Sequence, residues 1–365
     1  MFKKVVLLVA AVLFITLPAA AFDFGGSVDA SAGAAISDST TFSPSAKATV
    51  WVKAPLGNIT LSAEGYYKWS GSFIAGTDPS NTNVVDLSLL KISLPVADFL
   101  SLNIGRYSFS DVTSSVFATT SDGVNAAMTF GKIKVGAYAG YTGLLNANTV
   151  TLAGGPASDA EGVYVLAPKF AVLLANVSLP NFLGGNTFAL EATGSLDLNA
   201  EENGYEACNS FYGTLSAAGP ITTSIYYSAS ATGSYLTKDE DNLGIFGKGS
   251  IVCYLPVMSL SITASAAYGS ENFQAVSYNP YAGGILNGGL SVTLKPIDSL
   301  LCLVSGGIDC NTVGEFSAEK ANWTALAKWQ VLSDLSAFLS LGQDIALTDG
   351  GTNKFTVSAG ATVSF

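Results

Sequence analysis

The chain has 365 residues, of which 49% are hydrophobic and 12% are charged, and its formal net charge is −11. A soluble globular domain usually has about 25% charged residues, and a disordered chain has far fewer apolar ones, so this composition fits neither class. Histidine is absent, which excludes Ser-His triads, histidine general bases and histidine metal sites. Outside the N-terminus no apolar run reaches the roughly 18 residues that a transmembrane helix needs, so a helical membrane protein is excluded as well.

The first 21 residues have the three parts of a secretory signal peptide. Lys3 and Lys4 form a short basic region, Val5–Leu17 is apolar, and Ala19–Ala21 offers a small-residue cleavage site. We expect cleavage after Ala21, which makes residues 22–365 one exported domain; an uncleaved membrane anchor is the alternative. Loss of the two lysines leaves the chain more acidic still, which argues against a nucleic-acid partner.

From Phe22 onward, apolar and polar residues alternate with a period of two. Over Phe22–Ile36 the even positions are apolar or small and the odd positions are small or polar, and Lys354–Phe365 repeats the pattern. This period is typical of a strand with one oily and one wettable face. Similar runs occur at Ile59–Phe73, Ile133–Gly143, Thr187–Leu198, Ile245–Leu255 and Trp323–Val331.

The connections between these runs alternate in length. Short turns are expected near residues 55–58, 95–98, 131–132, 180–186, 219–220, 256–259, 296–299 and 333–334. Longer polar connections are expected at residues 37–44, 75–83, 110–123, 145–162, 199–206, 237–243, 270–282, 311–319 and 348–353. Together they would join 18 strands, or 16 if residues 162–179 are drawn differently.

An all-β, antiparallel transmembrane barrel accounts for this alternation. Short periplasmic turns and long extracellular loops are its usual pattern, and a soluble β-sandwich predicts no such asymmetry. In lipid every unpaired backbone group costs several kcal/mol, so the sheet has to close on itself and the first strand has to meet the last.

Two features resemble known bacterial proteins. The ending Ser358–Phe365 is similar to the C-terminal assembly signal of bacterial outer-membrane barrels, with Ser358, Gly360, Val363 and Phe365 in the matching positions. The segments at residues 105–111, 122–123 and 180–185 resemble outer-membrane barrel proteins of spirochaetes. The resemblance implies the cell outer membrane as location, with its lipid and the barrel-assembly machinery as partners.

Residues with the parity of the wettable face are expected to line the lumen. Most are Ser, Thr or Gly, and the charged ones are Lys47, Lys53, Glu64, Lys68, Lys134, Glu191, Lys248 and Lys328. An interior enclosed by about 18 strands is too wide for such side chains to fill, so water should occupy it.

Arg106, the one arginine of the chain, precedes the third long connection. In general porins that loop folds inward and narrows the pore, so Arg106 is predicted to oppose Asp111 or Asp122 at a constriction. Arg106 also shares parity with Leu102 and Ile104, which should face lipid. The alternative is therefore an arginine that extends to the membrane interface, unless a bulge reverses the parity.

Catalysis has little support in the sequence. Glu191 and Asp197 share one strand face, but at ~3.3 Å per residue they lie about 20 Å apart, beyond the separation that two-carboxylate hydrolysis needs. Residues 239–244 lack the ligand pattern of an EF-hand calcium loop, and the four cysteines form no metal or disulfide framework. We expect no enzyme activity, cofactor or metal.

The sequence thus predicts a porin-like channel for passive diffusion of small hydrophilic solutes. Two alternatives stay open: a surface adhesin or antigen that uses the barrel as a platform for its loops, and a channel for hydrophobic compounds, which would need a lateral opening or a kinked strand. Assembly into a homo-oligomer is also open.

Overall fold

The computed structural model describes residues 22–150, 152, 163–199, 207–238, 242–348 and 350–365. Within these ranges the chain forms one antiparallel sheet of 18 strands and one short 3-10 turn, η1 (Val257–Ser259). Among the described residues, no helix is long and apolar enough to cross a membrane. The predicted signal peptide, residues 1–21, lies outside the described residues.

The strands follow one another in chain order around the sheet. They are β1 (Asp23–Ile36), β2 (Thr40–Leu56), β3 (Ile59–Ile74), β4 (Ser80–Ala97), β5 (Leu100–Ser110), β6 (Ala118–Phe130), β7 (Ile133–Tyr141), β8 (Phe170–Phe182), β9 (Asn186–Asp197), β10 (Ser210–Pro220), β11 (Ile225–Leu236), β12 (Leu243–Leu255), β13 (Leu260–Gly269), β14 (Ile285–Ile297), β15 (Leu300–Asn311), β16 (Ser317–Gln330), β17 (Leu335–Ala346) and β18 (Lys354–Ser364).

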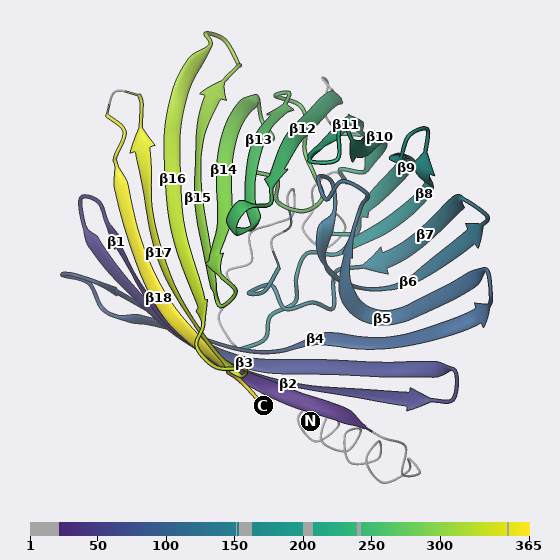
Figure 1. The fold of residues 1–365 in the computed structure, drawn as a ribbon, viewed down its shortest axis with the longest axis horizontal. Helices are drawn as coiled ribbons and strands as arrows, with labels where there is room; N and C mark the ends of the chain where they lie inside the picture. Colours follow the sequence, from purple (N-terminus) through teal and green to yellow (C-terminus); the bar gives the residue numbers. More distant parts are fainter. Residues whose placement is uncertain (1–21, 151, 153–162, 200–206, 239–241, 349) are drawn as a thin grey trace.

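The sheet closes into a barrel because β1 pairs with β18 as well as with β2. The ladder runs from Ser27 opposite Ser364 to Ile36 opposite Phe355. Beyond it, Gly26 and Phe365 exchange two backbone hydrogen bonds of 2.9 and 3.0 Å. Figure 1 shows the resulting ring of strands, in which β1 and β18 lie side by side. The predicted 18-stranded antiparallel barrel is confirmed, and the 16-stranded alternative is wrong.

Connections at the two ends of the barrel differ in length. At the end where β1 begins and β18 ends, all eight connections contain two to four residues. At the other end they range from three residues, between β1 and β2, to 28, between β7 and β8. The first of these is shorter than expected because β2 begins at Thr40. Pro44 lies inside β2, where the ladder to β3 skips it, as suits a residue that has no N–H to donate.

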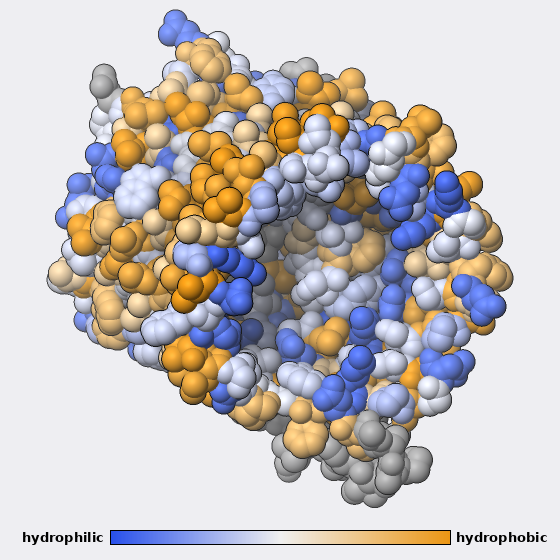
Figure 2. Space-filling model, in the orientation of Figure 1, coloured by the Kyte–Doolittle hydropathy of each residue, from blue (hydrophilic) through white to orange (hydrophobic). Residues whose placement is uncertain are grey.

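Alternate residues along each strand face opposite sides of the wall. On β9, Leu190 exposes 57% of its surface and the next residue, Glu191, exposes 2%. On β2, Val50 exposes 63% and Thr49 exposes 9%. Figure 2 shows a central hollow whose visible wall is mostly white and blue, while orange, hydrophobic side chains spread over the outer surface. The apolar face therefore lies outside and the polar face lines the lumen.

Candidate pore constriction and lumen

Loop L3 (residues 111–117) joins β5 to β6, and Asp111 determines its fold. The Asp111 carboxylate is 2% exposed and accepts a hydrogen bond of 2.8 Å from the Ser115 N–H. It also accepts longer bonds from the N–H groups of Val116 and Phe117 (3.3 and 3.4 Å) and a 3.0 Å bond from the Thr113 hydroxyl. The Asp111 N–H closes the loop by donating to the Phe117 carbonyl at 2.8 Å. This carboxylate is committed to the fold of its own loop.

L3 contacts wall strands that lie far from its own hairpin. The Val112 N–H donates to the Glu191 carboxylate on β9 at 3.1 Å, and Asn176 on β8 donates to the same carboxylate at 3.4 Å. The Lys248 ammonium on β12 donates to the Thr113 carbonyl. Since β12 is seven strands from β5 around an 18-stranded wall, L3 must extend into the lumen.

A second loop, L7 (residues 270–284, between β13 and β14), meets L3 inside the barrel. The N–H groups of Val276 and Ser277 both donate to the Val116 carbonyl, at 2.9 and 3.0 Å. The Ser277 hydroxyl accepts from the Ala118 N–H at 2.9 Å, and the Asn279 side chain donates to the Ser115 carbonyl at 3.1 Å. The two loops thus form one hydrogen-bonded unit across the lumen.

Aromatic rings fill the space between these loops and the wall. Tyr138 on β7 stacks on Phe109 with ring centroids 3.8 Å apart, and Phe117 of L3 lies 6.3 Å from it. On the far side, Phe273 of L7 stacks on Phe246 of β12 at 5.1 Å. The cluster's buried residues come from β5 to β13 and from the two loops. Its placement fills one side of the lumen and leaves the side of β14–β18 and β1–β3 free of it.

The predicted lumen charges fall into two groups. Glu191 and Lys248 hold L3, as described above. The others lie on the polar face of their strands: Lys47, Lys53, Glu64, Lys68, Lys134 and Lys328.

Within the second group, the lysines of β2 and β3 lie close together. Lys47 and Lys68 are directly opposite in the ladder, and the Lys47 ammonium sits 4.3 Å from the centre of the Tyr66 ring. Glu64 accepts a 2.6 Å hydrogen bond from the Ser88 hydroxyl. Lys53 and Lys68 are exposed. Asp23 and Asp29 of β1 lie directly opposite Lys53 and Lys47, so of these lysines Lys68 is the exposed one with no carboxylate opposite it.

Arg106 pairs with Asp122, one of the two carboxylates that the sequence offers it. Its Nε and Nη2 atoms donate to the two Asp122 oxygens at 2.9 and 2.8 Å. The two residues are opposite in the β5–β6 ladder, two positions beyond the exposed pair Ile104 and Val124. Arg106 keeps this parity yet is only 8% exposed.

Loop L4 (residues 142–169, described at 142–150, 152 and 163–169) covers the Arg106 side chain. Arg106 Nη2 donates to the Leu144 carbonyl at 2.7 Å, and the Tyr164 hydroxyl donates to the same carbonyl. Arg106 Nη1 also lies 3.5 Å from Asp86 on β4. The guanidinium therefore sits in the wall beneath L4, where it joins β4, β5 and β6.

Several contacts of the site had no signal in the sequence. Asp86 lies in an alternating strand that gives no hint of a buried ion pair, and Val276 and Ser277 belong to a loop of ordinary polar composition. Among the described residues no group of three or more His, Cys, Asp or Glu could hold a metal ion. Of the segment that lacks the EF-hand pattern, residues 239–241 lie outside the described part.

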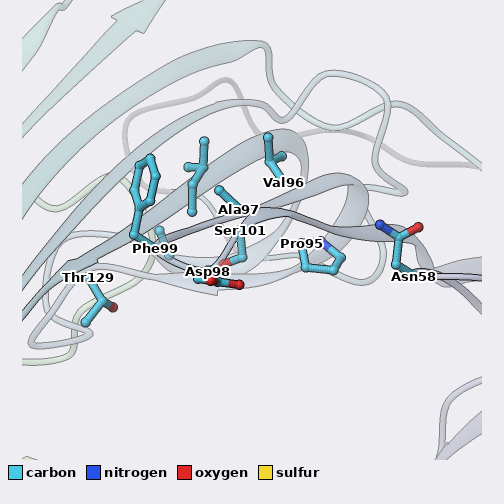
Figure 3. Close-up of a pocket in the computed structure, with 10 residues that line it drawn as sticks. Asn58, Pro95, Val96, Ala97, Asp98, Phe99, Ser101 and Thr129 are labelled. Carbon is cyan, nitrogen blue, oxygen red and sulfur yellow. The ribbon is translucent and has the colours of Figure 1, made fainter.

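A hollow at the turn end offers no further site chemistry. It lies between the turns of β2–β3 and β4–β5 and the end of β6, and Asp98 is the one charged residue among those that line it. Figure 3 shows Pro95, Val96 and Phe99 spread along the turn, with no polar groups that converge on one point.

Comparison with solved structures supports the fold over nearly the whole chain. The OccK7 (OpdD) protein of Pseudomonas aeruginosa has a TM-score of 0.64 at 9% identity and covers 94% of this chain and 98% of its own. The outer membrane protein OpdK of the same organism has a TM-score of 0.62 at 8% identity, over 94% and 99% of the two chains. OccAB4 of Acinetobacter baumannii has a TM-score of 0.62 at 9% identity, over 94% and 98%.

Sequence comparison gives no family. No protein-family model and no curated protein sequence matches the chain. At such low identities the structural likeness establishes the 18-stranded barrel fold and leaves the function to be argued from the site.

Proposed function

We propose that the chain is an outer-membrane channel of the porin type, through which small hydrophilic solutes diffuse passively. The observation that carries the proposal is L3, which is held across the lumen by Glu191, Lys248 and L7. A closed barrel that served only as a platform for surface loops would need no loop anchored inside its lumen. We assign the constriction to L3 as folded by Asp111, with Arg106 and Asp122 fixing the wall from which it departs.

Several finer features belong to the same proposal. The short turns face the periplasm and the long loops face outward, and the signal peptide is removed after Ala21. Ser358, Gly360, Val363 and Phe365 are read by the barrel-assembly machinery, as the resemblance of the C-terminus implies. The resemblance to spirochaete barrels and a homo-oligomeric assembly remain predictions. No catalytic step is assigned.

The accessible lysines of β2 and β3 favour anionic over cationic solutes. Lys68 is exposed and lies opposite Lys47 and Val84 in its two ladders, so no carboxylate faces it directly, whereas Lys53 is opposite Asp23. Asp111, Asp122 and Glu191 are all engaged in hydrogen bonds. Charges that line a narrow aqueous path set its ion selectivity. A structure of OpdK is described with vanillate, a small carboxylate, which makes vanillate a useful test solute here.

The test is reconstitution of the refolded chain, residues 22–365, in a planar bilayer. We expect stepwise ionic conductance and, in a salt gradient, a reversal potential of the sign given by anion preference. Vanillate on one side should lower the conductance of small ions while it occupies the lumen. A folded barrel that inserts but conducts no ions would refute the channel and favour the surface-platform alternative.

A further inference from the structure

The backbone ladder between β4 and β5 stops before the loop-side ends of the two strands. The ladder between these strands ends at Leu90 opposite Arg106, although β4 extends back to Ser80 and β5 continues to Ser110. Residues 80–89 and 107–110 therefore face each other without ladder pairs. In Figure 1, β5 curves away from the nearly straight β4.

Gly105 marks the point where β5 leaves β4. Its φ is +119°, and a Cβ at this position would lie 2.0 Å from the Leu90 carbonyl oxygen. Only glycine tolerates such a conformation and so close an approach to backbone. The separation of the two strands therefore depends on the glycine at position 105.

Side chains bond the Leu87 backbone groups where the ladder is missing. The Leu87 carbonyl, which faces the opening, accepts from Arg106 Nη1 at 3.4 Å, and the Leu87 N–H donates to the Asp86 carboxylate at 2.8 Å. Thr149 of L4 donates to the other Asp86 oxygen at 2.9 Å. In a bilayer these backbone groups need partners, and here the partners are side chains. They can separate by rotamer changes, without the unzipping of a strand pair.

Apolar side chains flank this seal on both sides of the wall. Outside, Leu87, Leu90 and Leu144 are exposed. Inside, Leu89 and Phe109 pack against the aromatic cluster of the lumen. A molecule with an apolar chain would keep that chain out of water as it passed between them, and a carboxylate head would find the Arg106 guanidinium at the same place.

We propose that the opening between β4 and β5, closed at rest by Arg106, Asp86 and Thr149, is a lateral gate that releases carboxylate-headed amphiphiles of the fatty-acid class from the lumen into the bilayer. The gate requires, as the proposed function does, that the barrel lie in a membrane. It does not require that the axial pore conduct ions.

The test uses a gate that can be locked and released. Cys208, Cys253, Cys302 and Cys310 are first replaced by alanine, and Asp86→Cys is combined with Thr149→Cys. The two side chains are in contact in the structure, so a short, reducible bifunctional thiol reagent can bridge them. The matched control is Ser291→Cys with Ser305→Cys, directly opposite in the intact β14–β15 ladder.

Uptake of a fluorescent dodecanoic acid by bacteria that carry each barrel in the outer membrane is measured with the bridge closed and after its reduction. We expect the closed bridge to lower uptake at least about fivefold and reduction to restore it, with axial conductance in bilayers unchanged and no effect in the control. The gate would be overturned if uptake is the same with the bridge closed and reduced, if uptake is absent in both states, or if uptake and axial conductance fall together.

Two further outcomes separate the proposals. Bridge-dependent uptake through a barrel that conducts no ions supports the gate and refutes the axial channel. Thr149→Val, in the otherwise native chain, removes the hydrogen bond to Asp86 and leaves Arg106 in place; it weakens the seal without a cross-link and is expected to raise uptake about threefold or more. Unchanged uptake by this variant, in barrels whose folding is verified by heat-dependent mobility on gels, counts against the gate.

Discussion

Replacement of Asp111 by alanine should release L3 from its folded position. The carboxylate accepts bonds from the N–H groups of Ser115, Val116 and Phe117 and from the Thr113 hydroxyl, and it is almost fully buried. A buried donor that loses its partner costs about 1–3 kcal/mol. The Ser115 bond is the shortest of the set and the others are longer or shared, so we expect the folded loop to lose about 2–4 kcal/mol in all.

A loss of this size changes the ratio of displaced to folded L3 by about 30- to 700-fold, since every 1.4 kcal/mol is a factor of ten. The contacts of L3 to Glu191, Lys248 and L7 remain, so the loop should fluctuate rather than leave the lumen. Single-channel recordings of Asp111→Ala should therefore show frequent steps to a higher conductance level.

The matched control for this prediction is Asp309→Asn on β15. Its carboxylate accepts from Asn287 within the wall and makes no hydrogen bond to L3 among the described residues, so the recordings of this variant should resemble those of the native chain. Asp111→Asn keeps one acceptor oxygen and should fall between the two. An Asp111→Ala channel with native conductance and noise would refute the argument that this carboxylate folds the constriction.

Three further changes test other parts of the site and the wall. Lys68→Glu places a negative charge opposite Lys47 on the open side of the lumen, and the reversal potential in a salt gradient should move toward cation preference. Arg106→Met leaves Asp122 without its buried partner, which should lower the free energy of unfolding by about 3 kcal/mol, measured as a shift in the denaturant midpoint; Arg106→Lys should lose less. Deletion of Phe365 removes the two backbone bonds to Gly26, and the fraction of heat-modifiable, closed barrel should fall in refolding assays.

The architecture could be predicted because its signal is local. Alternation at Phe22–Ile36 and at Lys354–Phe365 requires only that neighbouring residues face opposite sides of a wall, and lipid leaves such a sheet no choice but closure. The number of strands followed from counting connections. The exact starts of the strands could not be counted in this way. Residues 37–44 were expected to form a loop, but β2 begins at Thr40 and contains Pro44, which has no partner in the ladder to β3.

The position of Arg106 cannot be predicted from strand parity alone. The sequence correctly gave it the parity of Ile104, and on parity alone it should face lipid. Its burial comes from L4, whose Leu144 and Tyr164 reach it from about 40 to 60 residues further along the chain. No periodic pattern carries information about a contact of that kind.

The constriction and the gap in the wall have a common origin in the β5–β6 hairpin. L3 can meet Val276 of L7 only if the loop end of this hairpin leans into the lumen, and it can lean only if β5 parts from β4, which the conformation of Gly105 allows. The gap that this motion leaves exposes backbone groups of β4; Arg106 and Asp86 satisfy those of Leu87, and Thr149 of L4 holds the Asp86 carboxylate. The narrow axial pore and the side-chain seal in the wall therefore both result from the bend at Gly105. Valine cannot adopt the conformation of Gly105, so Gly105→Val should straighten the hairpin, widen the pore and close the gap together.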